Sequence, residues 1–243
     1  MPRCGAVADQ RRPERPATPR ETMTADVASL LSAAASRAAE DMHLFIDALA
    51  FAAHKHREQR RKNVAASPYI NHPIALAHVL IADAGIADIN VLCTAILHDT
   101  VEDTETTFEE LEARFGSEIA GMVREVTDDK AHPKERRKEL QVEHAPHLSH
   151  GARLVKLADK ICNLRDVADD PPAHWPRERR LEYFDWAKRV IDGLRGANSK
   201  LEALFDDVYT RGVETTMRAA PQAAVPRNGN SSASNSSGAS SGM

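Results

Sequence analysis

The chain has 243 residues, of which 42% are hydrophobic and 5% aromatic, and its formal net charge is −4. This length allows one folded region of about 150–200 residues with flanking tails, and the aliphatic composition favours a helical core over a β-sandwich. The net negative charge argues against a nucleic-acid-binding protein. The three cysteines are scattered and form no CxxC pair, so neither a disulfide framework nor a thiolate zinc site is expected.

The two ends differ in composition from the middle of the chain. Residues 1–23 contain four prolines and no periodic apolar pattern, and residues 219–243 are rich in Ser, Ala, Asn and Gly. Both are predicted to be disordered tails around a single domain at 24–218, and the sequence leaves open whether translation starts at Met1 or Met23. No apolar run reaches the roughly 20 residues that span a bilayer. With no hydrophobic N-terminal signal either, a soluble, cytoplasmic protein without a membrane partner is expected.

Helical patterns fill the predicted domain, and several have recognisable ends. Asp88 is placed to cap a helix that runs to His98, and Thr107 with Glu110 forms a capping box. No alternating strand pattern of any length appears, so the sequence predicts an all-α fold of about eight or nine helices. The expected helices cover residues 25–56, 73–83, 88–98, 107–116, 117–126, 133–145, 152–168, 177–193 and 197–210.

The first candidate ligand precedes the second of these helices, in the stretch PYINHPIALA. Proline disfavours the α conformation in the residue before it, so Pro73 is expected to hold His72 extended at the helix entrance. A fixed backbone suits a metal ligand. The same pattern also marks an ordinary helix boundary, and this position alone does not separate the two interpretations.

The stretch AILHDTVEDT places His98 and Asp99 side by side and follows them with Glu102 and Asp103. If the helix continues, His98 and Glu102 lie one turn apart on one face, and Asp99 and Asp103 on another. The alternative interpretation is a helix end followed by a solvated acidic turn.

The third stretch, VKLADKICNLRD, carries a polar stripe on an otherwise apolar helix. The stripe consists of Lys156, Asp159, Asn163 and Asp166. These residues are three, four and three positions apart, which places them on one side of a helix. Burial of a carboxylate in such a helix is costly unless the carboxylate is paired or binds a metal. A solvated outer face, or an ion pair between Asp159 and a lysine, is the alternative.

Together these stretches supply two imidazoles and two carboxylates without a thiolate: His72, His98, Asp99 and Asp159. Such a set suits Mn²⁺ and, less selectively, Fe²⁺, Zn²⁺ or Mg²⁺. A divalent ion lowers the pKa of a bound water and neutralises phosphate charge. Glu102 and Asp103 are then placed to orient or deprotonate the water, or to protonate the leaving oxygen.

Two basic runs stand out in this acidic chain. Each could be a solvated helix face, but beside a metal site they become candidates for binding a polyphosphate. Tyr69 and Asn163 could add hydrogen bonds or base stacking. The runs contain Lys55, Arg57, Arg60, Arg61 and Lys62 in the first, and Lys130, Lys134, Arg136, Arg137 and Lys138 in the second.

These stretches occur in an order and at a spacing that resemble the RelA/SpoT-type HD-domain alarmone hydrolases. The matching segments are FAAHKHREQRRK, PYINHPIALA, AILHDTVEDT, EVTDDK and VKLADKICNLRD. The resemblance spans about residues 45–210 and is greatest to the stand-alone small hydrolases of the metazoan SpoT-homologue type. The HD dipeptide alone would be a weak signal, whereas five collinear motifs are specific.

The resemblance implies an all-α HD fold, a bound Mn²⁺, and removal of the 3′-pyrophosphate from guanosine 3′,5′-bis(diphosphate) and its pentaphosphate form. By position, the metal ligands would be His72, His98, Asp99 and Asp159, and the catalytic pair Glu102 and Asp103. The nucleotide contacts would be Arg61, Lys62, Lys134 and Asn163, with Tyr69 as a further candidate. No synthetase domain follows, so synthesis of the alarmone by this chain is not expected.

Two alternatives remain at this point. The same ligands would serve an HD-family phosphatase acting on another nucleotide, such as NADPH. The second alternative is a non-catalytic alarmone sensor. Such a protein would be expected to lose the HD pair or the Glu–Asp pair, and both pairs are intact here. The expected partner in every case is a small guanine or related nucleotide, and the sequence does not indicate an oligomeric state.

Overall fold

The computed structural model describes residues 19–172 and 174–218. Most of the expected disordered tails, residues 1–23 and 219–243, lies outside these ranges, so the domain limits stay a prediction. The first helix begins at Pro19, earlier than the expected start at residue 25. No helix within the described ranges has both the length and the apolar character needed to cross a membrane.

The described residues form an all-α fold, as predicted, and nine of the helices have eight or more residues. Their only β pairing is one isolated bridge between Arg60 and Pro68. The nine helices are α1 (Pro19–Lys55), α2 (Asn71–His78), α3 (Ile89–Leu97), α5 (Phe108–Phe115), α6 (Ser117–Val126), α7 (Lys134–His144), α8 (His150–Asp169), α9 (Arg177–Asp192) and α10 (Ser199–Arg218). The shorter pieces are the turn α4 (Thr100–Asp103), a π-helical turn (Val79–Asp83) and a 3₁₀ turn (Ala145–His147).

Two predicted helix caps are confirmed. The Asp88 side chain accepts hydrogen bonds from the backbone N–H groups of Asn90 and Val91, and Thr107 accepts one from Glu110. These bonds satisfy N–H groups that have no partner within the helix. The helix expected at 117–126 is present as α6, and the residue in its cap position is Gly116, with φ of 88°, a backbone conformation that glycine adopts readily.

The expectation that Pro73 holds His72 extended is wrong. Helix α2 begins at Asn71, so His72 is helical, and its N–H donates to the Tyr69 carbonyl at 3.0 Å. Pro73 is the third residue of α2. A proline is tolerated in this first turn because the N–H groups there have no intrahelical acceptor.

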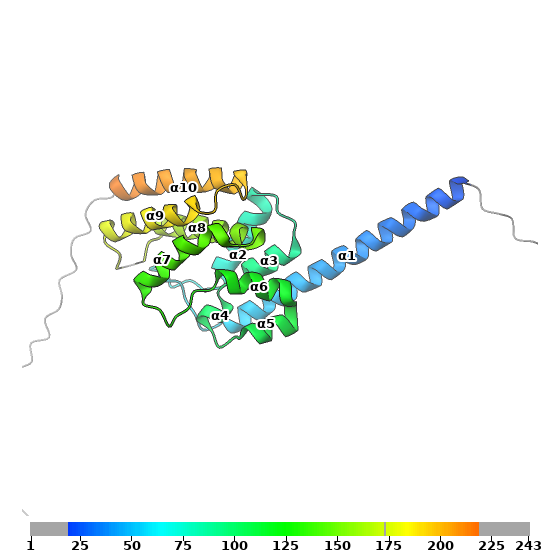
Figure 1. Ribbon diagram of the computed structural model, residues 1–243, viewed down its shortest axis with the longest axis horizontal. Coiled ribbons are helices and arrows are strands. Elements are labelled where there is room, and N and C mark those ends of the chain that lie inside the picture. Colours follow the sequence, from blue (N-terminus) through cyan, green and yellow to red (C-terminus); the bar gives the residue numbers. More distant parts are fainter. Residues whose placement is uncertain (1–18, 173, 219–243) are drawn as a thin grey trace, which may run out of the picture.

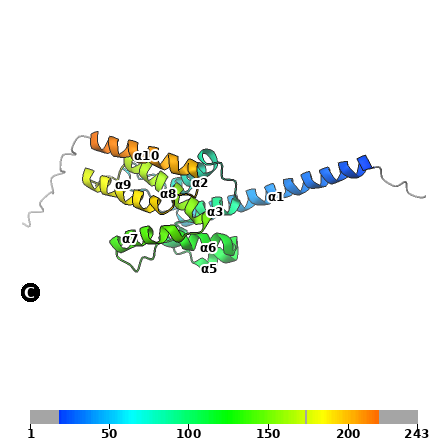
Figure 2. The same ribbon diagram turned by 45° about the horizontal axis from the view of Figure 1, so that its top comes forward.

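Helix α8 lies at the centre of the molecule and contacts α2, α3, α6, α9 and α10. Figures 1 and 2 show α8, α9 and α10 side by side, with α5 and α6 on the other side of the fold. Leu157, Ala158 and Ile161 of α8 are fully buried in one apolar cluster. A second cluster joins the C-terminal part of α1 to α3, α5 and α6. The site described below lies on α8 and the segments that surround it.

Only the C-terminal part of α1 belongs to this core. Ala48 and Ala52 are fully buried, whereas Leu30 and Met42 are 70% and 60% exposed. Figure 1 shows the N-terminal part of α1 extending away from the other helices.

Candidate functional site

Three of the four predicted metal ligands converge in the structure. One ligand atom from each of His72, His98 and Asp159 lies within 4.8 Å of the other two. The side chains come from α2, the end of α3 and the middle of α8, and the residues are only 5%, 5% and 8% exposed. His72 Nε2 lies 3.3 Å from Asp159 Oδ1. Packing of three helices therefore brings together groups that are far apart in the sequence.

The fourth predicted ligand, Asp99, lies beside this cluster. Its Oδ2 atom is 2.9 Å from His98 Nε2, and it accepts a hydrogen bond from the Tyr69 hydroxyl. His98 Nδ1 lies 2.9 Å from the Ala95 carbonyl, which requires the proton to be on Nδ1. The Nε2 atom thus faces the cluster, and its neighbour Asp99 Oδ2 is an acceptor, so a proton or a cation must lie between the two atoms.

These groups fit a divalent metal ion. A buried imidazole nitrogen of His98 lies close to the carboxylates of Asp99 and Asp159, and such an arrangement is unfavourable unless a cation or a proton joins the groups. Against the effect of burial, the charge of Asp99 raises the pKa of His98. A mixed imidazole and carboxylate set without thiolate suits borderline and hard divalent cations.

The HD pair lies at a break between two helices. Helix α3 ends at Leu97 and α4 begins at Thr100, and Asp99 between them has φ of −101° and ψ of 0°. The helix is therefore not continuous through this stretch. The Asp103 N–H still donates to the Asp99 carbonyl at 2.9 Å, so one further turn presents Glu102 and Asp103 beside the ligands.

Glu102 lies in a half-buried position with two donors. Its Oε2 accepts the backbone N–H of Asp128 at 3.2 Å, and its Oε1 lies 3.3 Å from Arg137 Nη1. Burial, followed by the negative charges of Asp128 and Asp99, raises the pKa of Glu102 to about 7. A carboxyl group with this pKa can exchange protons near neutral pH.

Asp103 is more exposed than Glu102 and is held by different groups. Its side chain accepts a hydrogen bond of 2.6 Å from Lys130, and its backbone carbonyl accepts one from the Gln59 amide. Gln59 in turn lies 2.7 Å from Nδ1 of the buried His56. The turn that carries both carboxylates is thus fixed by contacts from the first basic run and from residues 128–137.

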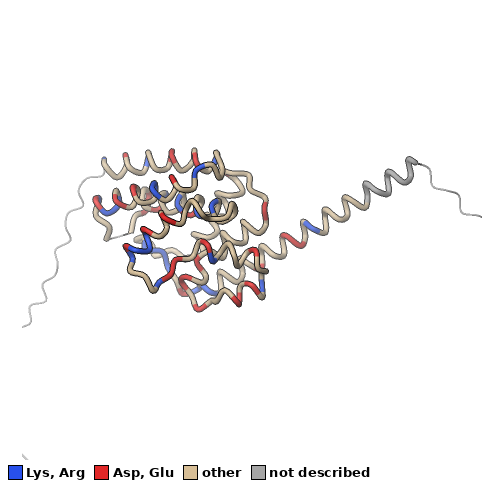
Figure 3. The backbone as a smooth tube through the Cα atoms, viewed as in Figure 1, with Lys and Arg blue, Asp and Glu red and all other residues tan. Residues whose placement is uncertain are grey.

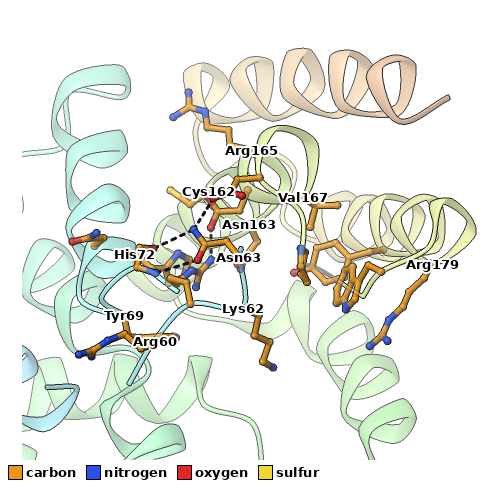
Figure 4. Close-up of a pocket in the computed structure, with 18 of the residues that line it drawn as sticks. Arg60, Lys62, Asn63, Tyr69, His72, Cys162, Asn163, Arg165, Val167 and Arg179 are labelled. Atoms are coloured by element: carbon orange, nitrogen blue, oxygen red, sulfur yellow. Dashed lines mark hydrogen bonds and ion pairs between the residues drawn. The ribbon is translucent and has the colours of Figure 1, made fainter. Parts of the chain in front are cut away.

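A cleft of about 1160 Å³ opens outward from an inner pocket of about 300 Å³ that contains the metal ligands. Four predicted substrate contacts, Arg61, Lys62, Tyr69 and Asn163, line both parts, and Lys134 lines the cleft. Figure 4 shows Lys62 and Arg179 on two different elements of this cleft. The structure therefore gathers all five positions around one continuous space.

Positive charges crowd together at the outer part of the cleft. Partial burial, followed by the charges of Arg179, Lys138 and Lys62, lowers the pKa of Lys134. Carboxylates, among them Glu135 and Glu178, line the same cleft, so an anion that enters it is attracted by the cations around Lys134 and repelled by these groups. Figure 3 shows that several positions along α7 are basic.

The remaining basic residues near the site have partners within the protein. Arg61 forms an ion pair with Asp166, and its guanidinium lies 5.6 Å from the centre of the Tyr69 ring. Lys55 pairs with Glu105 and Glu110, and the exposed Arg136 pairs with Glu139 and Glu143. The two basic runs therefore divide into residues that line the cleft and residues that belong to the outer surface.

The alternative that the sequence offered for Asp159, an ion pair with a lysine, is present in the structure, and the partner is Lys160. Lys160 is 3% exposed, donates to Asp159 Oδ2 at 3.0 Å and lies 4.5 Å from the centre of the Trp186 ring. Other residues of the site were not expected from the sequence. Tyr183 and Arg179 also line the site from α9. The position of Lys160 next to Asp159 in an apolar helix was an available signal, whereas nothing local marks α9 as a wall of the cleft.

This fold and this set of buried ligands define an HD-domain protein. The family model of the HD domain matches residues 48–185, a range that contains the three converging ligands, Asp99 and the Glu102–Asp103 pair.

Several similar proteins identify the family of this chain within the HD-domain proteins. Guanosine-3′,5′-bis(diphosphate) 3′-pyrophosphohydrolase MESH1 of Xenopus tropicalis is 54% identical over 169 residues, covering 70% of this chain and 94% of the relative. The Homo sapiens protein of the same name is 57% identical over 164 residues, covering 68% and 92%. A solved structure described as a metazoan orthologue of SpoT that hydrolyses ppGpp matches with a TM-score of 0.68 and 49% identity, covering 70% and 96%. The chain belongs to the MESH1 family.

Proposed function

We propose that this protein hydrolyses guanosine 3′,5′-bis(diphosphate), and its 5′-triphosphate form, to GDP or GTP and pyrophosphate. The observation that carries the proposal is the buried cluster of His72, His98 and Asp159 with Glu102 beside it, at the base of a cleft with crowded cations. The names of the similar proteins support the choice of substrate, because they describe the same reaction.

The proposed cofactor is Mn²⁺, held by His72, His98, Asp99 and Asp159. Such an ion supplies Lewis-acid chemistry, since it lowers the pKa of a water and offsets phosphate charge. Tyr69 and Asn163 orient two of the ligands, because the Tyr69 hydroxyl donates to Asp99 and the Asn163 amide donates to Asp159 at 2.5 Å. Partners of this kind fix the direction of metal ligands.

In the proposed reaction, Glu102 accepts a proton from the attacking water and Asp103 helps to orient that water. The water oxygen bonds to the phosphorus attached to the ribose 3′ oxygen, and the bond between this phosphorus and the 3′ oxygen breaks. The proton taken up by Glu102 can then pass to the 3′ oxygen, and pyrophosphate leaves with the water oxygen. Positioning and electrostatic stabilisation dominate phosphoryl chemistry of this kind.

The proposed nucleotide contacts are Arg61, Lys62 and Lys134, with Asn163 and Tyr69 close to the ligands. Arg61 can bind phosphate oxygens with two parallel hydrogen bonds, whereas Lys62 and Lys134 act as point charges. Because Arg61 is paired with Asp166, a phosphate must compete with this carboxylate for the guanidinium.

The test is release of pyrophosphate by the purified chain supplied with Mn²⁺. We expect turnover of guanosine 3′,5′-bis(diphosphate), and a lower kcat/KM for NADPH, whose hydrolysis is followed as release of inorganic phosphate. Faster turnover of NADPH would shift the assignment to a different nucleotide. Tight binding of the guanosine compound without turnover would instead identify a sensor.

A further inference from the structure

Helix α7 presents one face to the site, and the residues on this face reach two different groups of contacts. Lys134 and Lys138, four residues apart, line the outer cleft. Arg137 and Gln141, also four residues apart, point to the inner side, where Arg137 contacts Glu102 and Gln141 contacts Asp128. One short helix therefore touches both the crowded cations of the cleft and the surroundings of Glu102.

Arg137 and Gln141 reach Glu102 by two routes. Arg137 Nη1 lies 3.3 Å from Glu102 Oε1. The Gln141 amide donates to Asp128 Oδ2 at 2.7 Å, and the Asp128 N–H donates to Glu102 Oε2 at 3.2 Å. Each carboxylate oxygen of Glu102 thus has one partner, and both partners depend on the placement of α7.

These contacts are not explained by the packing of α7 itself. None of the residues of α7 is buried, so the helix rests on the fold through polar and partial contacts. Trp186 Nε1 donates to the Lys138 carbonyl at 3.0 Å, which ties α7 to α9. Arg137 Nε and Gln141 Oε1 are shielded from solvent without a hydrogen-bond partner, an arrangement that costs stability. A helix with so little apolar burial can shift when one of its faces binds a ligand.

We propose that α7 is a positioning element, in which Arg137 and Gln141 fix Glu102 when Lys134 and Lys138 contact the phosphates of the substrate. The inference rests on the proposed function, because it assigns a role to the surroundings of Glu102. Arg137 and Gln141 act through Glu102 and are positioning residues. Lys134 and Lys138 act in binding. Helix α7 thereby links binding of the substrate in the cleft to the position of the Glu102 carboxylate.

The two residue pairs, Arg137 with Gln141 and Lys134 with Lys138, should have separable effects in steady-state kinetics. Replacement of Arg137 by Met is expected to lower kcat by about 10–100-fold while KM changes less than about threefold, because the interaction matters after the substrate is bound. Arg137→Lys should recover part of the loss, since it restores a donor. Lys138→Met should mainly raise KM. Arg136→Gln is the matched control, because the neighbouring Arg136 is exposed and pairs with Glu139 and Glu143.

A double-mutant cycle distinguishes positioning of Glu102 from a general structural effect. In a Glu102→Gln background, Arg137→Met should change kcat by less than about threefold, because residues that act as one unit are not additive. A full 10–100-fold loss in that background would overturn the proposal. So would an Arg137→Met variant with wild-type kcat, or one in which only KM rises.

Hydrogen exchange gives a readout that does not depend on turnover. Amides of residues 99–104 should exchange faster in Arg137→Met than in wild type, and Arg136→Gln should match wild type. Unchanged exchange in Arg137→Met would overturn the positioning role even in an active enzyme. If the wild-type chain fails to release pyrophosphate while exchange changes as expected, the proposed function fails and the positioning of the 99–104 turn stands.

Discussion

Glu102 is the residue whose surroundings match its proposed role most closely, because it lies beside the ligands without belonging to the converging cluster. We expect Glu102→Gln to lower kcat by about 10²–10⁴-fold, the usual contribution of a positioned general base. Binding of Mn²⁺, measured by calorimetry, should persist in this variant. Asp99→Ala is the comparison, and it should weaken metal binding as well as activity. Wild-type turnover in either variant would contradict the assigned roles.

The raised pKa of Glu102 gives a direction for the pH profile. A general base must be deprotonated, and the pKa of Glu102 is about 7, so kcat should rise with pH through neutrality. Asp128→Asn removes a negative charge that raises this pKa, and the acid limb of the profile should therefore move to lower pH. The measurement is kcat between about pH 5.5 and 8.5. An acid limb that stays in place in Asp128→Asn would count against Glu102 as the titrating base.

The candidate ligands could be predicted from the sequence because each residue type is unusual in its local setting. Asp159 lies in an apolar helix, and His98 and Asp99 end one. The sequence offered an ion pair between Asp159 and a lysine as an alternative, and Lys160 forms it. Trp186 was not expected beside it, since a tryptophan in an amphipathic helix is ordinary. Their role depends on the distance of 4.5 Å between them in the folded chain, which no local pattern contains.

Among the elements, α10 shows how closely the helices behind the site pack. A Cβ atom at Gly212 would overlap the ring of Phe184 on α9. Gly212→Ala should therefore lower the free energy of unfolding by about 1–3 kcal/mol through overpacking. Gly121→Ala in α6 is the control, because a Cβ there meets nothing within 4 Å, and it should raise the free energy of unfolding by about 0.5–1 kcal/mol. Urea unfolding measures both, and equal stability of the two variants would contradict this account.

Helix ends were predictable where a side chain caps the backbone, as at Asp88 and Thr107, because capping is a local interaction. The end of α3 at Leu97 lies one residue from the expected end at His98, but the sequence left open whether the helix continues beyond it, since the stretch that follows is compatible with a longer helix. In the structure, the contact of Asp99 with His98 and Tyr69 accompanies the break. The position of α9 against α8 likewise depends on tertiary packing and not on local sequence. This packing brings Arg179 and Tyr183 to the cleft.

For the molecule as a whole, metal binding should stabilise the fold. Ligands from α2, α3 and α8 lie in one cluster, so an ion that binds only the folded chain adds about 2.7 kcal/mol at 100 times its Kd. For a chain of this size, the expected rise in Tm is about 5–10 °C. Differential scanning calorimetry with Mn²⁺ and with a chelator measures the difference. His98→Ala should show no such rise, and a wild-type Tm that is equal in both conditions would exclude a site of this kind.

The two tryptophans of the chain both lie at the site, one in each of its parts. Trp175 lines the outer cleft, and the buried Trp186 lines the inner pocket beside Lys160. Indole emission responds to nearby charge and polarity, so the protein carries its own optical reporter for each compartment. After replacement of Trp175 by Phe, only the tryptophan of the inner pocket would emit. After replacement of Trp186 by Phe, only the tryptophan of the outer cleft would emit. Entry of a nucleotide and arrival of an ion could then be timed separately, in stopped flow, without any attached dye.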